Sequence, residues 1–229
     1  MTQNPGGLSH GVITVALLMS LCVCLAAKPF TQSRAVQYDK GFGPSFYEMS
    51  LSHGYPGSYK QIESIDFRNM TLDIIGKDRN VEASAKLEGG NYEHKISGGL
   101  QNFKLDSIHY LPSAHSDRQF ALLLWTVFSA TGSSNTDGFA QVYELKGTQL
   151  ELVQQIGWDE HFDTNGPYVL FNQQKQALTV RSGHYLPGDA HCCVSAVDVV
   201  TLQWGNDRFT KKTVSVELSN YGLKSGKKL

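Results

Sequence analysis

Two adjacent cysteines follow a histidine and an aspartate in residues 188–198, GDAHCCVSAVD, which is the strongest candidate for chemistry in the sequence. His184, Asp189, His191, Cys192 and Cys193 together offer the nitrogen, oxygen and sulfur ligands that zinc or copper would take. Adjacent side chains point to opposite sides of an extended backbone, so both thiolates reach one ion only at a distorted turn. A metal-binding or redox site is therefore one interpretation of this loop.

A disulfide between Cys192 and Cys193 is the interpretation that we favour. Consecutive Cα atoms lie ~3.8 Å apart, below the ~4.4 Å at which ordinary disulfides begin, so such a bond is strained and easily reduced. It closes almost no loop and would rigidify a single turn. The alternative is a pair of free thiols, one buried and one partly exposed. We expect no cofactor, with zinc or copper as the alternative.

An acidic loop is the second cluster of polar residues. Its members are Asp159, Glu160, Asp163 and Asn165, between two predicted strands. Oxygen ligands at alternating positions are typical of calcium loops, but the ligand order and the distal glutamate of an EF-hand are absent. The interpretation that we favour is a polar connection in which Asp163 or Asn165 caps its own turn.

The N-terminal residues indicate export. The chain carries no charge from Val12 to Ala27 and has small residues just before Lys28, as a signal peptide does. This stretch is shorter than the ~20 apolar residues of a membrane-spanning helix, although an uncleaved anchor stays open because no lysine or arginine precedes it. We expect a secreted or periplasmic protein that contacts a membrane only if this segment is retained. Cleavage would leave Cys192 and Cys193 as the mature cysteines, in an oxidising compartment.

Composition is that of one globular domain. The 229 residues are 41% hydrophobic and 18% charged, which is enough for one sizeable core. The formal charge of -1 argues against a nucleic-acid partner. The expected partner is an unknown ligand or a component of the cell envelope.

The elements that must position these side chains are strands. Apolar and polar residues alternate around glycine-containing or polar turns, which predicts hairpins in residues 139–158, 168–182, 197–218 and 82–97. Residues 64–76 and 103–111 are further strand candidates. Residues 118–130 form a continuous apolar run that suits a doubly covered central strand, with a buried helix as the rival interpretation.

These patterns predict a mainly β fold with little helix. About ten strands would form an antiparallel meander, arranged as a sandwich, an open barrel or a propeller-like stack. We expect a signal peptide over residues 1–27, an extended lead-in over 28–62, a single β-rich domain over 63–218 and a flexible basic tail over 219–229.

The cysteine segment also resembles a loose family of exported bacterial proteins that includes LppP/LprE-type lipoproteins. These proteins carry a Gly-Asp-x-x-Cys-Cys-Pro-Ser segment before a strand that ends in Trp-Asp-Gly, and the matching residues here are Gly188, Asp189, Cys192, Cys193, Ser195 and Trp204. Val194 replaces the proline, and Gly205-Asn206-Asp207 replaces Asp-Gly. The resemblance spans about residues 119–210. It implies export and a β-rich fold, without implying an activity, and the absence of a lipobox puts the lipid anchor in doubt.

Three functional hypotheses follow from the sequence. The first is a noncatalytic exported β domain that binds a ligand or partner through loops at one end of its sheet. The second is a metal-binding or redox protein that uses the cysteine loop. The third is a hydrolase, which would require the acidic loop to converge with a histidine such as His109 or His115.

Overall fold

The fold is known from a computed structural model that describes residues 33–34, 48–76, 79–96, 99–130, 134–157, 168–189 and 194–229. The chain divides into two compact units, Met1–Phe30 and Thr31–Leu229, and all described residues belong to the second. The expected signal peptide therefore lies outside the described residues. Among the residues that are described, no helix is long and apolar enough to cross a membrane.

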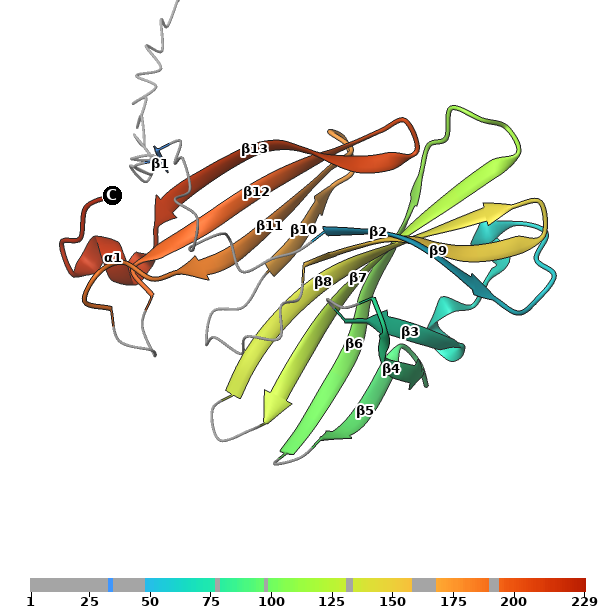
Figure 1. Ribbon diagram of the computed structural model, residues 1–229, viewed down its shortest axis with the longest axis horizontal. Helices are drawn as coiled ribbons and strands as arrows, with labels where there is room; N and C mark the ends of the chain where they lie inside the picture. Colours follow the sequence, from blue (N-terminus) through green and yellow to red (C-terminus); the bar gives the residue numbers. More distant parts are fainter. Residues whose placement is uncertain are drawn as a thin grey trace, which may run out of the picture. The chain divides into compact units, whose positions relative to one another are not determined.

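Six antiparallel strands form a curled sheet, drawn from blue through green to yellow in Figure 1. Five of them follow one another as a meander, and the earliest strand closes the row beside the last. In spatial order they are β2 (Glu48–Tyr55), β9 (Gln149–Gly157), β8 (Ser134–Lys146), β7 (Arg118–Ala130), β6 (Gly99–Leu111) and β5 (Asn91–Ile96).

A second antiparallel sheet contains the C-terminal strands, coloured orange to red in Figure 1. Consecutive strands are again neighbours, and a two-residue strand pairs with the last of them. The order is β1 (Ser33–Arg34), β13 (Arg208–Leu218), β12 (Ala196–Gly205), β11 (Ala177–His184) and β10 (Tyr168–Asn172). Asn206 and Asp207 make the β12–β13 turn with φ angles of 51° and 60°, as a tight hairpin requires.

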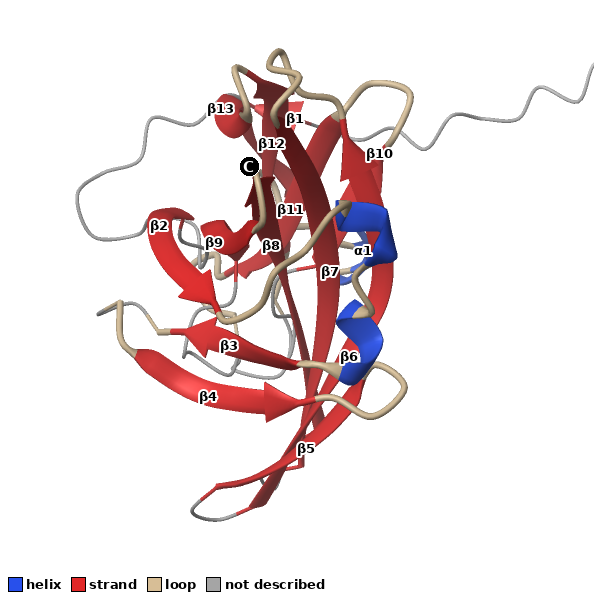
Figure 2. Ribbon diagram, turned by 90° about the vertical axis from the view of Figure 1, so that its right-hand side faces the viewer, coloured by secondary structure: helices blue, strands red, loops and turns tan. Residues whose placement is uncertain are grey.

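A small third sheet and three short helical segments complete the fold (Figures 1 and 2). The small sheet pairs β3 (Thr71–Ile75) with β4 (Val81–Lys86). Two 3₁₀ turns, Ile62–Ser64 and Phe67–Asn69, precede it, and helix α1 (Asn220–Lys224) follows β13. The mainly β, antiparallel fold predicted from the sequence is confirmed.

Strand β7 separates two hydrophobic cores. Its alternate side chains Ala121, Leu123, Trp125 and Val127 join the inner core, which also contains the buried residues of β3 and β4. Leu122 and Leu124 join the inter-sheet core, which contains buried residues of β11, β12 and β13. Because β7 is covered on both faces, its sequence is continuously apolar, and the expectation of a central strand rather than a helix is confirmed.

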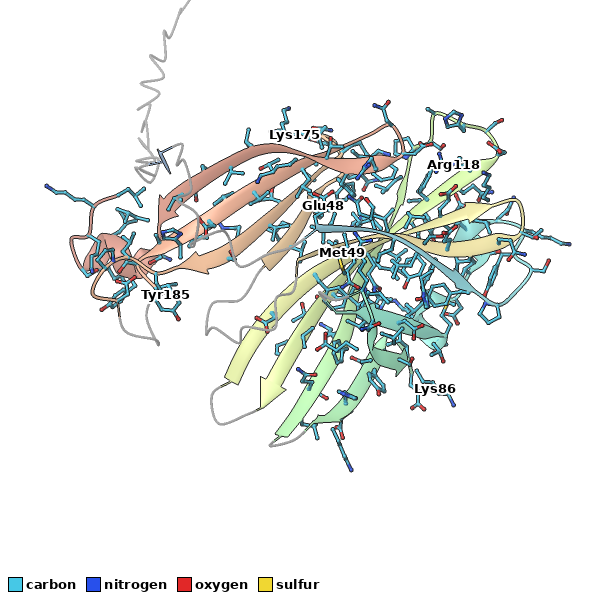
Figure 3. The ribbon with its side chains drawn as sticks, viewed as in Figure 1. Glu48, Met49, Lys86, Arg118, Lys175 and Tyr185 are labelled. Atoms are coloured by element: carbon cyan, nitrogen blue, oxygen red, sulfur yellow. The ribbon has the colours of Figure 1, made fainter. Side chains whose placement is uncertain are left out.

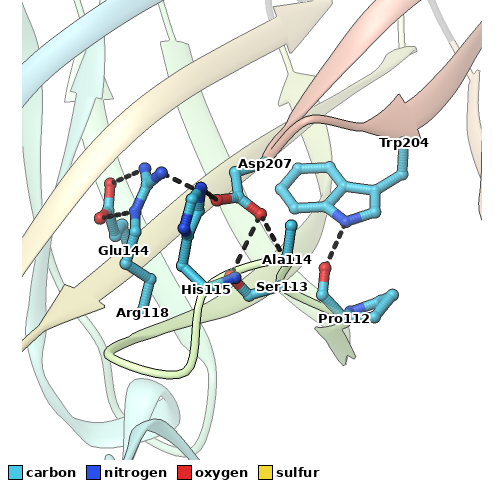
Figure 4. A network of polar contacts seen from close by, with 8 residues as sticks. All are labelled: Pro112, Ser113, Ala114, His115, Arg118, Glu144, Trp204 and Asp207. Carbon is cyan, nitrogen blue, oxygen red and sulfur yellow. Dashed lines mark hydrogen bonds and ion pairs between the residues drawn. The ribbon is translucent and has the colours of Figure 1, made fainter.

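A salt-bridge cluster fastens the two large sheets together at the β12–β13 turn (Figure 4). Arg118 of β7 binds both carboxylate oxygens of Glu144, at 2.5 and 2.8 Å, and donates to Asp207 at 2.8 Å. Asp207 also accepts from the Ser113 hydroxyl and the Ala114 N–H. The cluster therefore holds the turn of one sheet against the end of the other.

Several sequence-based expectations need correction. Residues 48–55 were expected in an irregular lead-in, but they form β2 at the edge of the curled sheet. Residues 64–76 contain a strand only from Thr71 onward, because 3₁₀ turns precede it. The turn at Gly89–Gly90 does not close a hairpin, since β4 pairs with β3 and β5 pairs with β6. The tail expected to be flexible contains α1.

Candidate functional site

Two consecutive glutamines of β9 point to opposite faces of the curled sheet and connect it to its neighbours. On the inner face, the Gln155 amide accepts from the Ile75 N–H at 3.2 Å and donates to the Ile75 carbonyl at 2.5 Å. On the other face, the Gln154 amide makes the same pair of bonds with the main chain of Phe209, at 3.0 and 2.9 Å. Each side chain thus pairs with a strand of another sheet as a backbone would.

The inner glutamine continues into a buried hydrogen-bonded chain. Gln141 donates to the carbonyl of Asp73 and to Gln155, and the Tyr143 hydroxyl donates to Gln141. The Tyr143 hydroxyl lies 3.3 Å from that of Tyr55. Burial raises the pKa of Tyr55 to about 12 and that of Tyr143 well above its usual value, so both remain neutral donors and acceptors.

This chain fixes the position of Asp73 on β3. Its N–H donates to the Tyr55 hydroxyl at 3.0 Å, and its carbonyl accepts from Gln141 at 2.8 Å. The carboxylate oxygens contact His53 at 2.7 Å and Ser84 at 2.5 Å. The Asp73 side chain is 18% exposed, so its carboxylate reaches solvent although Tyr55 and Gln141 fix its main chain.

The carboxylate lies in a pocket of about 430 Å³, which we call the tyrosine pocket. Its lining residues come from β2, from the segment after it and from the small sheet, and they are Gly54, Tyr55, Pro56, Tyr59, Met70, Thr71, Asp73 and Ser84. The volume is within the range of small-molecule sites. No lysine or arginine is among these described lining residues.

The Tyr59 wall of this pocket is held in place. Its hydroxyl donates to the Pro56 carbonyl at 3.1 Å, and its N–H donates to the Thr148 carbonyl at 3.1 Å. A Cβ on Gly57 would lie 2.5 Å from the Tyr59 ring, so this close approach requires glycine. The ring is therefore positioned before any ligand arrives.

A second pocket of about 390 Å³, the junction pocket, lies where β10 meets strands β6, β7 and β8. Ser107 and His109 face it, with their Oγ and Nε2 atoms 3.0 Å apart. The His109 ring packs on Phe171 with the centroids 4.9 Å apart. Burial lowers the pKa of His109, which favours the neutral imidazole.

Two aspartates, Asp106 and Asp137, line the junction pocket, and Asp106 differs from Asp73 of the tyrosine pocket in its partners. Asp106 accepts a hydrogen bond from Thr126 and forms an ion pair with Lys104 at 3.0 Å. Lys104 neutralises the carboxylate, whose side chain is 36% exposed. Asp106 therefore has a lysine as its ion-pair partner, whereas Asp73 contacts His53 and Ser84.

Two of the residues predicted for a metal site are structural in the described part of the chain. His184 hydrogen bonds through Nδ1 to Asp198, at 3.1 and 3.2 Å to its two oxygens, and this bond raises the pKa of His184. Within the described residues, no three histidine, cysteine, aspartate or glutamate side chains are placed to hold a metal ion. His191, Cys192 and Cys193 lie outside those residues, so the predicted constellation is not assembled in what the structure describes.

The Asp189 side chain ties together the two ends of the cysteine segment. It accepts from the Ser195 hydroxyl at 2.5 Å, the Ser195 N–H at 2.8 Å and the Leu186 N–H at 2.8 Å, and Lys227 lies 3.3 Å away. Burial alone raises the pKa of this carboxyl, but the hydrogen bonds outweigh that effect and hold the pKa well below its usual value. Asp189 is thus an ionised structural anchor.

Helix α1 supports the same segment from its C-terminal side. The Ser219 hydroxyl donates to the Val194 carbonyl at 2.6 Å and accepts from the Gly222 N–H. A Cβ on Gly222 would lie 2.0 Å from the Ser195 carbonyl oxygen, so only glycine fits there. The predicted basic tail therefore packs against Val194 and Ser195, the residues that follow the two cysteines in sequence.

The remaining predicted residues do not form a site among the described groups. The acidic loop Asp159, Glu160, Asp163 and Asn165 lies outside the described residues, so its convergence with His109 or His115 is untested. The His115 side chain is 62% exposed and lies 3.8 Å from Asp207.

Sequence reasoning missed the tyrosine pocket altogether. Its residues are spread over three short elements, and one of these, β2, was placed in an irregular segment. The signal that could have found it is the pair Gln154–Gln155, because two adjacent amides between the apolar residues Val153 and Ile156 need buried partners. No protein-family model, curated protein or solved structure matches this chain.

Proposed function

We propose that this protein is a noncatalytic binding domain that takes a small polar ligand in the tyrosine pocket. The observation that carries the proposal is Asp73, whose main chain is held by Tyr55 and Gln141 and whose carboxylate lines a pocket with aromatic walls. Positioning polar groups in advance reduces the entropy lost on binding. We therefore place the binding region in this pocket and not in loops at one end of the sheet.

The hydrogen-bonding order around Asp73 favours binding over catalysis. In a serine–histidine–aspartate relay the histidine lies between the other two groups. Here the aspartate lies in the middle, since Ser84 and His53 both contact its carboxylate. Ser84 therefore donates directly to a carboxylate, with no histidine between the two groups. In the junction pocket, Ser107 contacts His109, but packing on Phe171 rather than a described carboxylate orients the ring.

A secreted or periplasmic location is part of the proposal, and it rests on the N-terminal sequence. The adjacent cysteines then act as a structural disulfide in the turn that follows Asp189. The hydrogen bonds of Asp189 to Ser195 support this role because they hold both ends of the cysteine segment. Intact mass before and after reduction and alkylation tests it, and two free thiols in freshly isolated protein would contradict it.

Ligand binding is tested by filling the pocket. Thr71 is an exposed strand residue that lines it, and Thr213 is an exposed strand residue of β13 that does not. We expect small polar fragments to shift the NMR signals of the pocket residues. Thr71→Trp should abolish these shifts, and Thr213→Trp should preserve them. Fragment shifts that cluster elsewhere, or that survive Thr71→Trp, would sink the proposal.

A further inference from the structure

We propose that the ligand of the tyrosine pocket is a small methylated ammonium cation. This inference rests on the proposed binding function and names the chemical class of the ligand. Three properties of the pocket carry it: a carboxylate with no lysine or arginine among the described lining residues, two fixed tyrosine rings, and carboxylate oxygens that already accept hydrogen bonds from His53 and Ser84.

The charge of the pocket is negative. Asp73 contributes a carboxylate, and no lysine or arginine is among the described lining residues. Glu151 pairs with Gly54 across the edge of the pocket and accepts a hydrogen bond from Ser52. Lys86 lies opposite Thr71 at the end of β4, and its side chain is exposed (Figure 3). An anionic ligand would be repelled at the floor of this pocket.

The walls of the pocket suit a cation that carries methyl groups. Tyr55 and Tyr59 supply aromatic rings, and Met70 supplies a polarizable thioether. Quaternary ammonium groups bind on aromatic faces because the ring quadrupole attracts the cation. Tyr55 is held by Tyr143 and by the Asp73 N–H, and Tyr59 is held by Pro56. The rings therefore need no reorganisation to receive the ligand.

The hydrogen bonds of Asp73 favour a methylated cation over a primary amine. Each carboxylate oxygen already accepts one hydrogen bond, from His53 on one side and Ser84 on the other, which leaves about two of the carboxylate's four acceptor positions for a ligand with three donors. A primary ammonium needs hydrogen-bond acceptors for its three donors, whereas a trimethylammonium group needs only charge and apolar contact.

The probes are choline, tetramethylammonium and 3,3-dimethylbutan-1-ol, which is the neutral isostere of choline. Calorimetric titration of the full-length protein should show choline and tetramethylammonium binding about 10-fold or more tighter than the alcohol, because the alcohol lacks the charge. Sodium acetate should not bind.

Matched variants locate the effect. Asp73→Asn should weaken choline binding about 10-fold, whereas Asp106→Asn, which changes another aspartate that accepts from a strand hydroxyl, should leave it unchanged. Tyr59→Leu should weaken binding about 5-fold, and Tyr59→Phe should retain most of it. Circular dichroism checks that each variant is folded, and Tyr59→Leu serves if Asp73→Asn does not fold.

The possible outcomes separate the inference from the function beneath it. Equal affinity for choline and its neutral isostere would overturn the cation inference, while Thr71→Trp sensitivity would still support a ligand in this pocket. Absence of choline binding would overturn the inference. Choline binding that is insensitive to Asp73, Tyr59 and Thr71 substitutions would also overturn it, because the cation would be bound elsewhere.

Discussion

The two faces of the curled sheet carry glutamine and aspartate side chains that have different roles on each face. On the inner face, Gln155 begins a hydrogen-bonded chain that reaches the Asp73 carbonyl, beside a pocket with no lysine or arginine among its described lining residues. On the opposite face, Gln154 attaches the second sheet, and of the two aspartates that line the junction pocket, Asp106 is paired with Lys104. Residue type alone therefore does not distinguish a structural face from a binding face. The distinction lies in which residues fix the main chain of each aspartate and which residues contact its carboxylate.

The paired glutamines offer the strongest test of this contrast. Gln155→Ala removes the side-chain partner of both main-chain groups of Ile75, and Gln154→Ala does the same for Phe209. We expect each to lower the free energy of unfolding by about 3 kcal/mol in urea denaturation. Only Gln155→Ala should also weaken choline binding, since it loosens the support of Asp73. Equal losses of choline binding in both variants would remove the distinction between the faces.

The salt-bridge cluster provides the next largest effect. Arg118→Met leaves the nearly buried carboxylates of Glu144 and Asp207 without their cation. We expect a loss of about 2 kcal/mol of stability, reduced from the value for fully buried pairs because Arg118 is partly exposed. Choline binding should not change, because the cluster belongs to the face that joins the sheets. The double variant Arg118→Met/Glu144→Gln should recover part of the loss in the same urea denaturation.

His109 provides a test by pH. Its pKa is lowered by burial, so in the pH range just below the ordinary histidine value the unfolded chain binds the proton and the folded protein does not. His109 therefore makes the protein lose stability as the pH falls through that range.

Phe171→Ala should expose the His109 ring, raise its pKa toward the ordinary value and reduce this acid-dependent loss. The lost packing should cost about 1.5 kcal/mol at neutral pH, since Phe171 is half-buried. NMR titration of the imidazole signals measures the pKa. An unchanged pKa would show that Phe171 does not shield the ring.

The smallest effect is expected at Lys104. Its ion pair with Asp106 is exposed, so Lys104→Ala should change the free energy of unfolding by less than about 0.5 kcal/mol. The same variant removes the charge compensation of the junction pocket. If weak tetramethylammonium binding then appears near Asp106 in NMR spectra, charge compensation alone separates the two pockets. We expect none, because the junction pocket lacks a pair of tyrosines.

The hairpins were predictable because their signals are local. Alternation on both sides of a turn located β8–β9, β10–β11 and β12–β13, and the apolar run of β7 indicated a strand buried on both faces. The small sheet was not predictable in the same way. The chain turns at Gly89–Gly90 between β4 and β5, but these two strands do not pair with each other. Strand β2 was missed because its partner β9 is remote in sequence.

The binding pocket was beyond sequence reasoning for a related reason. The sequence directs attention to clustered residues such as His184 and Asp189, which serve as structural anchors in the fold. His53, Asp73 and Ser84 are each unremarkable in sequence, and only long-range pairing brings them together. The residues that are close together in sequence thus have structural roles, whereas the groups suited to binding come from separate strands.

The pairing of β2 with β9 has a consequence for the order of synthesis. Glu48 lies beside Ile156 and Tyr55 beside Leu150, so the first strand of the curled sheet is made on the order of a hundred residues before its partner. Until β9 emerges, the apolar side chains of β2 have no sheet to cover them. A nascent chain that stops before residue 149 therefore exposes Met49 and Tyr55 together with an unpaired strand edge, which a chaperone or a protease can recognise.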